Sequence, residues 1–210
     1  MYWNANSVNN KIVELYEFLN QQHIQLSCIS ETFLNPNQHL LSHPDYNIYR
    51  FDRTQNSRGG VAIIVNKSLN HQLLPNVNLK IIECISVEVK LMNHSKTIFH
   101  SVYLPGSASS TMIRQHFIND LRKLIRFSGN TSYFICGDFN TKHRHWNCNR
   151  ANLAGTLLYE EYINSNFQIL HPDEPTYIPE DNRRTPSTID LIITNALHQT
   201  TDLYLSLIHI

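Results

Sequence analysis

Apolar residues recur at helical spacing in three parts of the chain, residues 8–19, 113–125 and 157–163. Ser7 or Asn9 is available as the N-cap of the first segment. Ser109 and Ser110 precede the second segment and predict its start. The pattern therefore predicts three amphipathic helices separated by long stretches of different periodicity.

The stretches between these helices carry the patterns of β-strands. Residues 61–65 form a continuous branched apolar run, which is typical of a buried strand. Residues 85–90 alternate between apolar and polar side chains, the mark of a half-buried strand. Further strands are predicted at residues 26–30, 97–104, 133–135 and 189–194, with a first strand beginning at Trp3. Strands outnumber helices and some follow one another directly, which favours mixed sheets over a purely parallel one.

The composition describes one globular domain, or at most two small ones. The 210 residues are 41% hydrophobic and 16% charged, and no repeat or linker divides them. A formal net charge of zero argues against a protein with a strongly basic nucleic-acid-binding face. Three basic clusters remain as candidate contacts, with solvated loops as the alternative reading: Arg50, Arg53 and Arg58; Lys142, His143, Arg144, His145 and Arg150; and Arg183 with Arg184.

Cysteine usage and hydropathy bear on the compartment. The four cysteines form no C-x-x-C pair, and three lie in apolar or strand-like contexts. This predicts reduced, mostly buried thiols of an intracellular protein and not a disulfide framework or a zinc site. No apolar run is long enough to span a bilayer, and the polar amino terminus does not fit a signal peptide.

The segment Cys-Gly-Asp-Phe-Asn at 136–140 follows the apolar run 133–135 and predicts a buried strand that ends at a turn. On an extended chain, Asp138 and Asn140 would point to the same side. A carboxylate and an amide would then sit at the carboxyl end of a strand, where open α/β sheets place their sites. Gly137 lacks a Cβ, so a backbone or a ligand can approach closely. The alternative is an ordinary turn, since Gly, Asp and Asn are common turn residues.

Four other strand ends carry polar groups: Asn4, Glu31, Tyr103 and Asp190. Carboxylate oxygens suit Mg²⁺, which one or two protein carboxylates usually hold. A further carboxylate can orient or deprotonate an attacking water. Asparagine and tyrosine can hold a phosphate oxygen and stabilise its developing charge. Each residue alone also has an ordinary structural reading, so the prediction rests on their combination.

Six motifs follow one another along the chain: Trp-Asn at 3–4, Ser-Glu-Thr at 30–32, Arg-Gly-Gly-Val-Ala-Ile at 58–63, Tyr-Leu-Pro at 103–105, Gly-Asp-Phe-Asn at 137–140 and Thr-Ile-Asp-Leu-Ile-Ile-Thr at 188–194. In this order they resemble the endonuclease/exonuclease/phosphatase superfamily. Thr-Lys-His at 141–143 with Trp146, and Pro-Thr-Tyr at 175–177, are typical of one subgroup. This subgroup is the apurinic-like endonuclease domain of non-LTR retrotransposons, in particular jockey-type elements. The resemblance covers about residues 2–204.

The resemblance implies an α/β (α+β) fold, a four-layer sandwich of two mostly antiparallel packed sheets with helices outside. It implies Mg²⁺-dependent nicking of double-stranded target DNA, with Mn²⁺ as an alternative ion. The nick would leave a 3′-hydroxyl for a reverse transcriptase domain downstream in the same polyprotein. Such a domain would act in the nucleus and would have no membrane partner.

Site roles carry over by motif. Glu31 would be the principal metal ligand with Asn4 beside it, and Asp138 would orient or activate water. Asn140 and Tyr103 would contact the scissile phosphate. Asp190 would support a remaining catalytic group by hydrogen bonding. DNA contacts are expected from loops that carry Arg58, Lys142, His143 and Arg183.

The carboxyl-terminal sequence departs from the pattern of this family. The remaining catalytic group is a histidine in an Asp-His pair shortly after the late strand, and it is missing here. His209 follows Ile208 and does not take its role. The last six residues match the translation of a sequencing-adapter end, with a diverged natural terminus as the alternative. We therefore expect an endonuclease domain at 1–204 without its last strand, and a non-native tail at 205–210.

A second departure and two competing functions remain. Ser7 stands where many relatives have glycine, which jockey-type elements tolerate.

One alternative is a host phosphodiesterase of the same superfamily, such as a repair enzyme or an inositol phosphatase. The other is a decayed remnant without enzymatic activity, which the missing histidine favours for this polypeptide.

Overall fold

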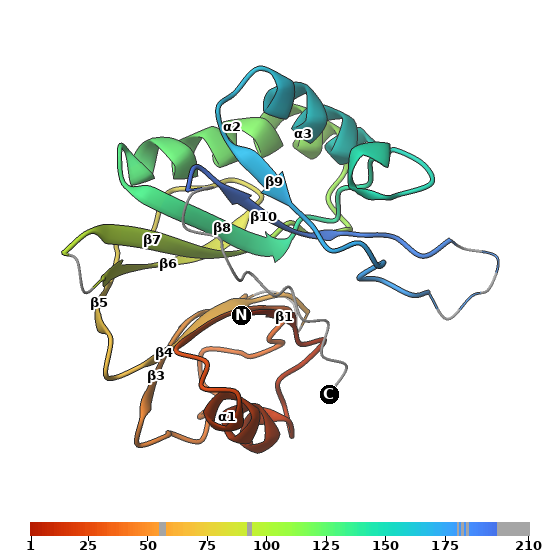
Figure 1. The fold of residues 1–210 in the computed structure, drawn as a ribbon. Helices are drawn as coiled ribbons and strands as arrows, with labels where there is room; N and C mark the ends of the chain where they lie inside the picture. Colours follow the sequence, from red (N-terminus) through yellow and green to blue (C-terminus); the bar gives the residue numbers. More distant parts are fainter. Residues whose placement is uncertain (55–57, 92–93, 180, 182, 184, 197–210) are drawn as a thin grey trace.

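Two β-sheets stack face to face and helices cover both outer sides, which gives the computed structural model four layers (Figure 1). It describes residues 1–54, 58–91, 94–179, 181, 183 and 185–196. The small sheet has the strand order β1 (Tyr2–Asn4), β2 (Leu26–Ser30), β4 (Val61–Asn66) and β3 (Tyr46–Phe51). The large sheet has the order β5 (Asn70–Leu73), β6 (Glu83–Lys90), β7 (Lys96–Tyr103), β8 (Ser132–Asp138), β10 (Asp190–Thr194) and β9 (Gln168–Leu170).

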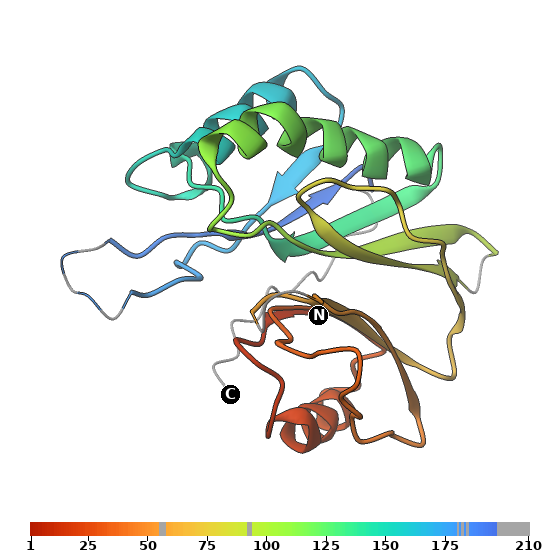
Figure 2. The ribbon, with the colours of Figure 1, turned by 180° about the vertical axis from the view of Figure 1, so that it is seen from behind.

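Each pair of neighbouring layers encloses its own hydrophobic core. Helix α1 (Ile12–Gln21) packs on the small sheet, while α2 (Ser110–Ser128) and α3 (Leu153–Ile163) cover the large sheet (Figure 2). A third core lies between the sheets and contains Cys28, Ile63 and Val87, all fully buried. The pairs β1–β2 and β7–β8 are parallel, and the other described pairings are antiparallel. The expected sandwich of mostly antiparallel sheets is therefore confirmed.

The first helix begins later than the sequence pattern indicated. Helix α1 starts at Ile12, and its N-cap Lys11 has no side-chain capping bond. The backbone N–H groups of Ser7 and Val8 instead donate to the carbonyl oxygens of Glu31 and Thr32, at 2.8 and 3.1 Å. Those bonds hold the segment against the loop after β2, so the expected caps Ser7 and Asn9 are wrong.

The other two helices show what local sequence decides. Ser109 caps α2 by accepting a hydrogen bond from the backbone N–H of Met112, as expected. Helix α3 begins at Leu153, one turn before the predicted segment, because the side chain of Asn152 accepts from the backbone N–H of Gly155. The short strands β3, β5 and β9 were not predicted, since they lack a clear apolar alternation.

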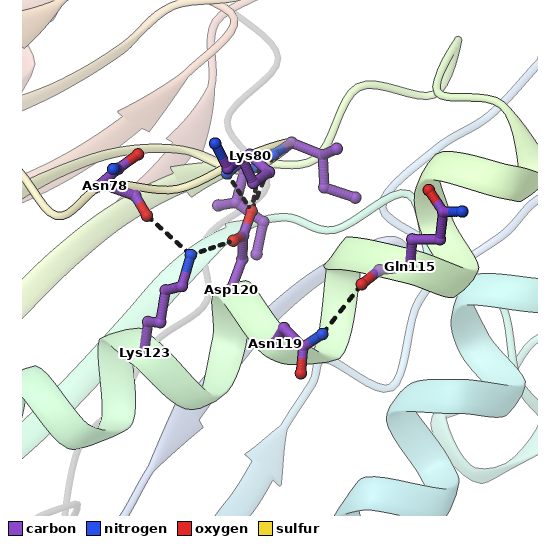
Figure 3. A network of polar contacts seen from close by, with 8 residues as sticks. Asn78, Lys80, Gln115, Asn119, Asp120 and Lys123 are labelled. Atoms are coloured by element: carbon purple, nitrogen blue, oxygen red, sulfur yellow. Dashed lines mark hydrogen bonds and ion pairs between the residues drawn. The ribbon is translucent and has the colours of Figure 1, made fainter.

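A buried carboxylate joins helix α2 to the loop that enters β6 (Figure 3). Asp120 Oδ2 accepts from the backbone N–H groups of Lys80, Ile81 and Ile82, at 2.7, 2.8 and 3.4 Å. Lys123 Nζ contacts Asp120 Oδ1 and donates to the carbonyl oxygen of Asn78. Three backbone donors and a cation thus satisfy the charge of Asp120 and fix the loop directly before Glu83.

The described cysteines are all free and buried, as the sequence predicted: Cys28, Cys84, Cys136 and Cys148. Within the part of the chain that the structure describes, no helix has the length and apolarity required to cross a membrane.

A buried histidine links the large sheet to α2. His100 Nε2 lies 2.9 Å from Ser128 Oγ, and the Ser128 hydroxyl donates to the carbonyl oxygen of Leu124. Nε2 must therefore be the donor to Ser128, which leaves Nδ1 to accept from the Ser86 hydroxyl at 2.7 Å. Burial lowers the pKa of His100 to about 3.

We expect His100 to make stability depend on pH. In the unfolded chain His100 takes up a proton below its pKa of about 6.5, whereas in the folded chain it stays neutral until the pH reaches its lowered pKa. The contribution of His100 to stability is therefore complete above about pH 6.5 and falls as the pH drops below that value. Between about pH 7.5 and about pH 5 the loss from this group is about 2 kcal/mol.

The measurement is urea unfolding of the wild type and of His100→Gln across this range. The variant should be less stable near neutral pH, because it loses a hydrogen bond, yet the difference should shrink on acidification. Parallel stability curves would contradict a neutral, buried His100.

Candidate active site

Four polar side chains form one row across the large sheet. The strand register pairs Glu83 with Tyr103, Tyr103 with Asp138, and Asp138 with Asp190. Residues directly opposite each other on neighbouring strands project to the same face of a sheet. The row therefore gathers three carboxylates and a phenol, although Glu83 and Asp190 lie 107 positions apart in the sequence.

The small sheet supplies the other half of the site. Asn4 lies at the end of β1, and its Nδ2 donates to Asp138 Oδ2 at 3.0 Å. The same amide hydrogen bonds to Glu31, while Asn4 Oδ1 accepts from the backbone N–H of Asn6. One asparagine thus contacts a carboxylate from each sheet.

Tyr2 makes the second contact between the sheets and was not predicted. Its hydroxyl donates to Asp190 Oδ1 at 2.6 Å and lies 2.5 Å from Ser30 Oγ. Burial raises the pKa of Tyr2 well above its ordinary value, and the charges of Asp190 and Asp138 act in the same direction. The sequence signal was available, because Tyr2 and Asn4 are two residues apart on a strand and share a face.

Glu31 occupies a backbone conformation that favours glycine, with φ at 53°. Its carbonyl oxygen accepts from Ser7, and the next N–H group, of Thr32, donates to the carbonyl oxygen of Gly60. The side chain, which is partly exposed, hydrogen bonds to Tyr103 and Asn4. Loops on both sides therefore hold the strained residue, a pattern common at functional sites.

Glu83 is a second residue that sequence analysis missed. Its Oε2 accepts from the backbone N–H of Gly60 at 2.6 Å, and Oε1 accepts from Arg53 Nε at 2.5 Å. Both bonds pin the segment that carries Arg58 beside Glu31. A carboxylate directly after the apolar pair Ile81–Ile82 and before the predicted strand at 85–90 was the signal that could have identified it.

Asn140 lies beside Asp138, but the predicted extended spacing of these two residues is wrong. Strand β8 ends at Asp138, and Asn140 has a φ of 46°, so the two-residue spacing of a strand does not apply. The backbone N–H of Asn140 donates to Asp138 Oδ1 at 2.8 Å, and its Nδ2 donates to the carbonyl oxygen of Leu104. A turn closed on the Asp138 carboxylate brings the two residues together.

The missing Cβ of Gly137 serves a backbone approach and not a ligand. A Cβ built there would lie 2.1 Å from the carbonyl oxygen of Val102 on the neighbouring strand β7. Gly137 thus lets β7 and β8 pair closely, one residue before Asp138.

Burial and mutual repulsion raise the pKa of each carboxyl group at the centre. Desolvation raises the pKa of Asp138 well above its usual value, and the charges of Asp190 and Glu31 add to this. Burial raises the pKa of Asp190 to about 6, against the hydrogen bonds from Thr176 and Tyr2. Burial also raises the pKa of Glu31, while Tyr103, Asn4 and Arg58 oppose it. Such mutually perturbed groups are typical of functional sites.

These donors fit a hard divalent cation. In the described residues no group of three or more His, Cys, Asp or Glu side chains forms a ligand set for a metal. Mg²⁺ does not need such a cage, because it is usually held by one or two carboxylates, water and substrate phosphate. The carboxylate of Glu31 meets that requirement, and Asn4 would add its oxygen after rotation of the amide, which here presents Nδ2 to the carboxylates. A cation would offset the repulsion among the neighbouring carboxylates.

Two of the predicted basic clusters meet beside this centre. A cavity of about 670 Å³ reaches Asn140 and is lined by Lys142, Arg150, Tyr177 and Arg183. Lys142 Nζ lies 5.7 Å from the centre of the Tyr177 ring, and Arg183 pairs with Asp181. The segment between β9 and β10 that carries Tyr177 and Arg183 projects from the body of the molecule (Figure 1).

The other candidate cations have different surroundings. Arg58 is exposed, and its charge acts on Glu31. His143 is partly exposed and stacks on Tyr159, with ring centres 4.2 Å apart. Arg50 pairs with Asp52, and Arg53 with Glu83. Arg184, the expected position of the Asp-His pair and the proposed tail 205–210 lie outside the described residues.

Several known proteins are similar to this chain in sequence. A family model described as endonuclease-reverse transcriptase matches residues 97–207. The RNA-directed DNA polymerase from mobile element jockey of Drosophila funebris is 28% identical over 195 residues, which are 92% of this chain and 20% of that protein. The probable RNA-directed DNA polymerase from transposon BS of Drosophila melanogaster is 26% identical over 199 residues, 94% of this chain and 21% of that protein. The chain thus spans about a fifth of the length of the curated relatives it matches.

Solved structures share the fold at low sequence identity. The endonuclease domain of TRAS1, a telomere-specific non-LTR retrotransposon, is similar with a TM-score of 0.68 and 15% identity, over 88% of this chain and 78% of that one. The AP endonuclease LMAP from Leishmania major is similar with a TM-score of 0.71 and 13% identity, over 93% of this chain and 78% of that one.

Ser7 offers a test of backbone strain beside the site. Its φ is 82°, a region that costs L-residues other than glycine about 1–2 kcal/mol. Ser7→Gly should therefore raise the unfolding free energy by about 0.5–1 kcal/mol, after the larger entropy loss of glycine is subtracted.

Thermal unfolding measures the effect as a rise of a few degrees in midpoint. Ser68→Gly is the matched control, because Ser68 is exposed, lies in a turn and is not among the residues with positive φ. A midpoint that falls equally in both variants would show that Ser7 is not strained.

Proposed function

Because the chain belongs to the endonuclease-reverse transcriptase family, we propose that it is the DNA-nicking endonuclease domain of a non-LTR retrotransposon polyprotein. One observation carries the proposal. Asn4 and Glu31 of one sheet meet Tyr103, Asp138 and Asp190 of the other, beside a cavity lined by cations. Oxygen donors for a divalent ion and positive charge for a phosphate backbone are what phosphodiester hydrolysis requires.

The proposal extends to partners and compartment. The substrate is double-stranded DNA, and the nick supplies a 3′-hydroxyl to a reverse transcriptase domain of the same polyprotein. The similarity to two Drosophila RNA-directed DNA polymerases supports that partner. Such a domain acts in the nucleus, and residues 1–204 form its endonuclease unit.

Glu31 and Asn4 are the proposed ligands for Mg²⁺, or for Mn²⁺. When bound, the ion supplies a positive charge that polarises the scissile phosphate and stabilises its developing charge. Asp138 orients the attacking water and accepts its proton, a role that suits a carboxyl with a raised pKa.

The remaining side chains bind the phosphate. The Asn140 amide carries two N–H donors, of which one is used by Leu104, so the second can donate to a phosphate oxygen. Burial raises the pKa of Tyr103 above its ordinary value, so its hydroxyl keeps its proton. The hydroxyl donates to Glu31 in this structure and would turn to a phosphate oxygen when substrate binds. Asp190 is proposed to support the remaining catalytic group by hydrogen bonding, although the histidine that takes this role in the family does not occur in this sequence.

Nicking of supercoiled plasmid tests the proposal. Because the sequence lacks the Asp-His pair expected after the late strand, the wild-type chain should relax plasmid only slowly in Mg²⁺, and a chelator should stop the reaction. Asp138→Asn should lower the rate by about 10²–10⁴-fold, the usual contribution of a general base. Its unfolding midpoint should be unchanged or higher, because the variant removes a buried, repelled charge.

Asp45→Ala is the control, since Asp45 is exposed directly before β3, whose start pairs with Asn66 at the end of β4 remote from Gly60 and the site. Nicking that survives the chelator, or that is equal in Asp138→Asn and Asp45→Ala, would contradict the proposal.

Arg58 is expected to contact the DNA backbone. Arg58→Ala should weaken binding to duplexes of any sequence and reduce the slope of log K against log salt by about one, as for one phosphate contact. Fluorescence anisotropy at several salt concentrations measures this slope. Lys90→Ala, at the exposed end of β6, should leave it unchanged; equal slopes in all three proteins would refute the assignment.

A further inference from the structure

The Tyr2 hydroxyl connects the two sheets at the candidate active site. Tyr2 lies on β1, an edge strand of the small sheet, and is 4% exposed. Asp190 lies on β10 inside the large sheet, 188 residues further along the chain. The hydrogen bond between them is therefore a contact that only the packing of one sheet on the other creates.

This contact lies next to a second one of the same kind. Tyr2 and Asn4 occupy alternate positions on β1, so both side chains project toward the large sheet. Trp3 projects the other way and belongs to the core beneath α1. The two β1 side chains donate to adjacent carboxylates, Tyr2 to Asp190 and Asn4 to Asp138. Those carboxylates are register partners on β10 and β8.

Packing alone does not account for the hydroxyl. The aromatic ring belongs to the core between the sheets, where a phenylalanine would bury the same surface. Ser30 Oγ, on the neighbouring strand of the same sheet, lies 2.5 Å away and would by itself satisfy the hydroxyl. The additional bond to Asp190 Oδ1 thus bears on the orientation of that carboxylate and not on solvation of the phenol.

We propose that Tyr2 is a positioning residue of the nuclease, which holds the Asp190 carboxylate in the orientation that phosphodiester hydrolysis needs. The inference rests on the proposed function, since it assigns the residue to that reaction. Tyr2 fixes one oxygen of Asp190 from the opposite sheet, while the Thr176 hydroxyl hydrogen bonds to the same carboxyl from the segment before β10. Two donors on different segments leave the carboxylate little rotational freedom beside Asp138.

A positioning role predicts a loss in turnover and not in binding. Tyr2 is buried and does not reach the DNA, so Tyr2→Phe should leave KM and DNA affinity within about twofold. Displacement of Asp190 by a fraction of an ångström should lower kcat by about 10–100-fold. Tyr46→Phe is the matched control, because Tyr46 is a buried tyrosine of the same sheet whose hydroxyl donates to the backbone of Ile24. It should retain wild-type kinetics.

Ser30→Ala separates the two partners of the hydroxyl. It removes the bond within the small sheet and keeps the bond to Asp190, so it should cost clearly less kcat than Tyr2→Phe. A Ser30→Ala loss equal to that of Tyr2→Phe would overturn the inference, because local packing in the small sheet would then explain both.

A double-mutant cycle supplies the decisive readout. If Tyr2 acts through Asp190, Tyr2→Phe should change kcat less than twofold in an Asp190→Ala background. An equal fold-loss on Tyr2→Phe in the wild-type and Asp190→Ala backgrounds would overturn the inference and leave the proposed function intact. An unchanged kcat of Tyr2→Phe in the wild-type background would have the same meaning. Absence of nicking by the wild-type chain in Mg²⁺ would instead overturn the proposed function and the inference together.

Discussion

The arrangement of the site depends on two hydrogen bonds that join the sheets at one end of the sandwich. Asn4 Nδ2 donates to Asp138 and the Tyr2 hydroxyl donates to Asp190. Apolar contact between the sheets is non-directional and would tolerate small shifts of one sheet over the other. Hydrogen bonds between buried groups tolerate little displacement, because a lost partner leaves a desolvated polar atom. These two bonds, together with that of the Gly60 N–H to Glu83, therefore oppose a shift of one half of the site over the other.

The same end of the molecule concentrates charges that destabilise the fold. Glu31, Asp138 and Asp190 lie close enough that burial and repulsion raise the pKa of all three carboxyl groups. Asp120 shows the contrast, since three backbone N–H groups and Lys123 compensate its buried charge. A fold selected only for stability would treat every buried carboxylate in that way. The hydrogen bonds to the central carboxylates do not offset burial and repulsion, since all three pKa values remain raised, which fits the proposed divalent cation as a neighbour.

Residues outside the centre hold the loops that frame it. Glu83 ties the segment of Gly60 and Arg53 to the large sheet, and the carbonyl of Gly60 in turn accepts from Thr32 directly after Glu31. Asp120 fixes the loop that leads into Glu83. Backbone hydrogen bonds to the carboxylates of Asp120 and Glu83 thus connect α2 with the segment that holds Glu31.

The sequence by itself determined which segments form the main helices and strands, because apolar periodicity and the Ser109 cap act over a few residues. It also predicted that Asn4, Glu31, Tyr103, Asp138, Asn140 and Asp190 belong to one site, since polar groups at the ends of buried strands stand out and resemble family motifs, and the structure brings these residues together. Only the tertiary structure decided that Tyr2 and Glu83 lie beside them and that Asn140 adopts a left-handed conformation next to Asp138. It also decided that α1 begins late, because Ser7 and Val8 hydrogen bond to the loop of Glu31. These outcomes depend on strand register and on one sheet packing over the other. Both join residues far apart in the chain, so no local pattern contains them.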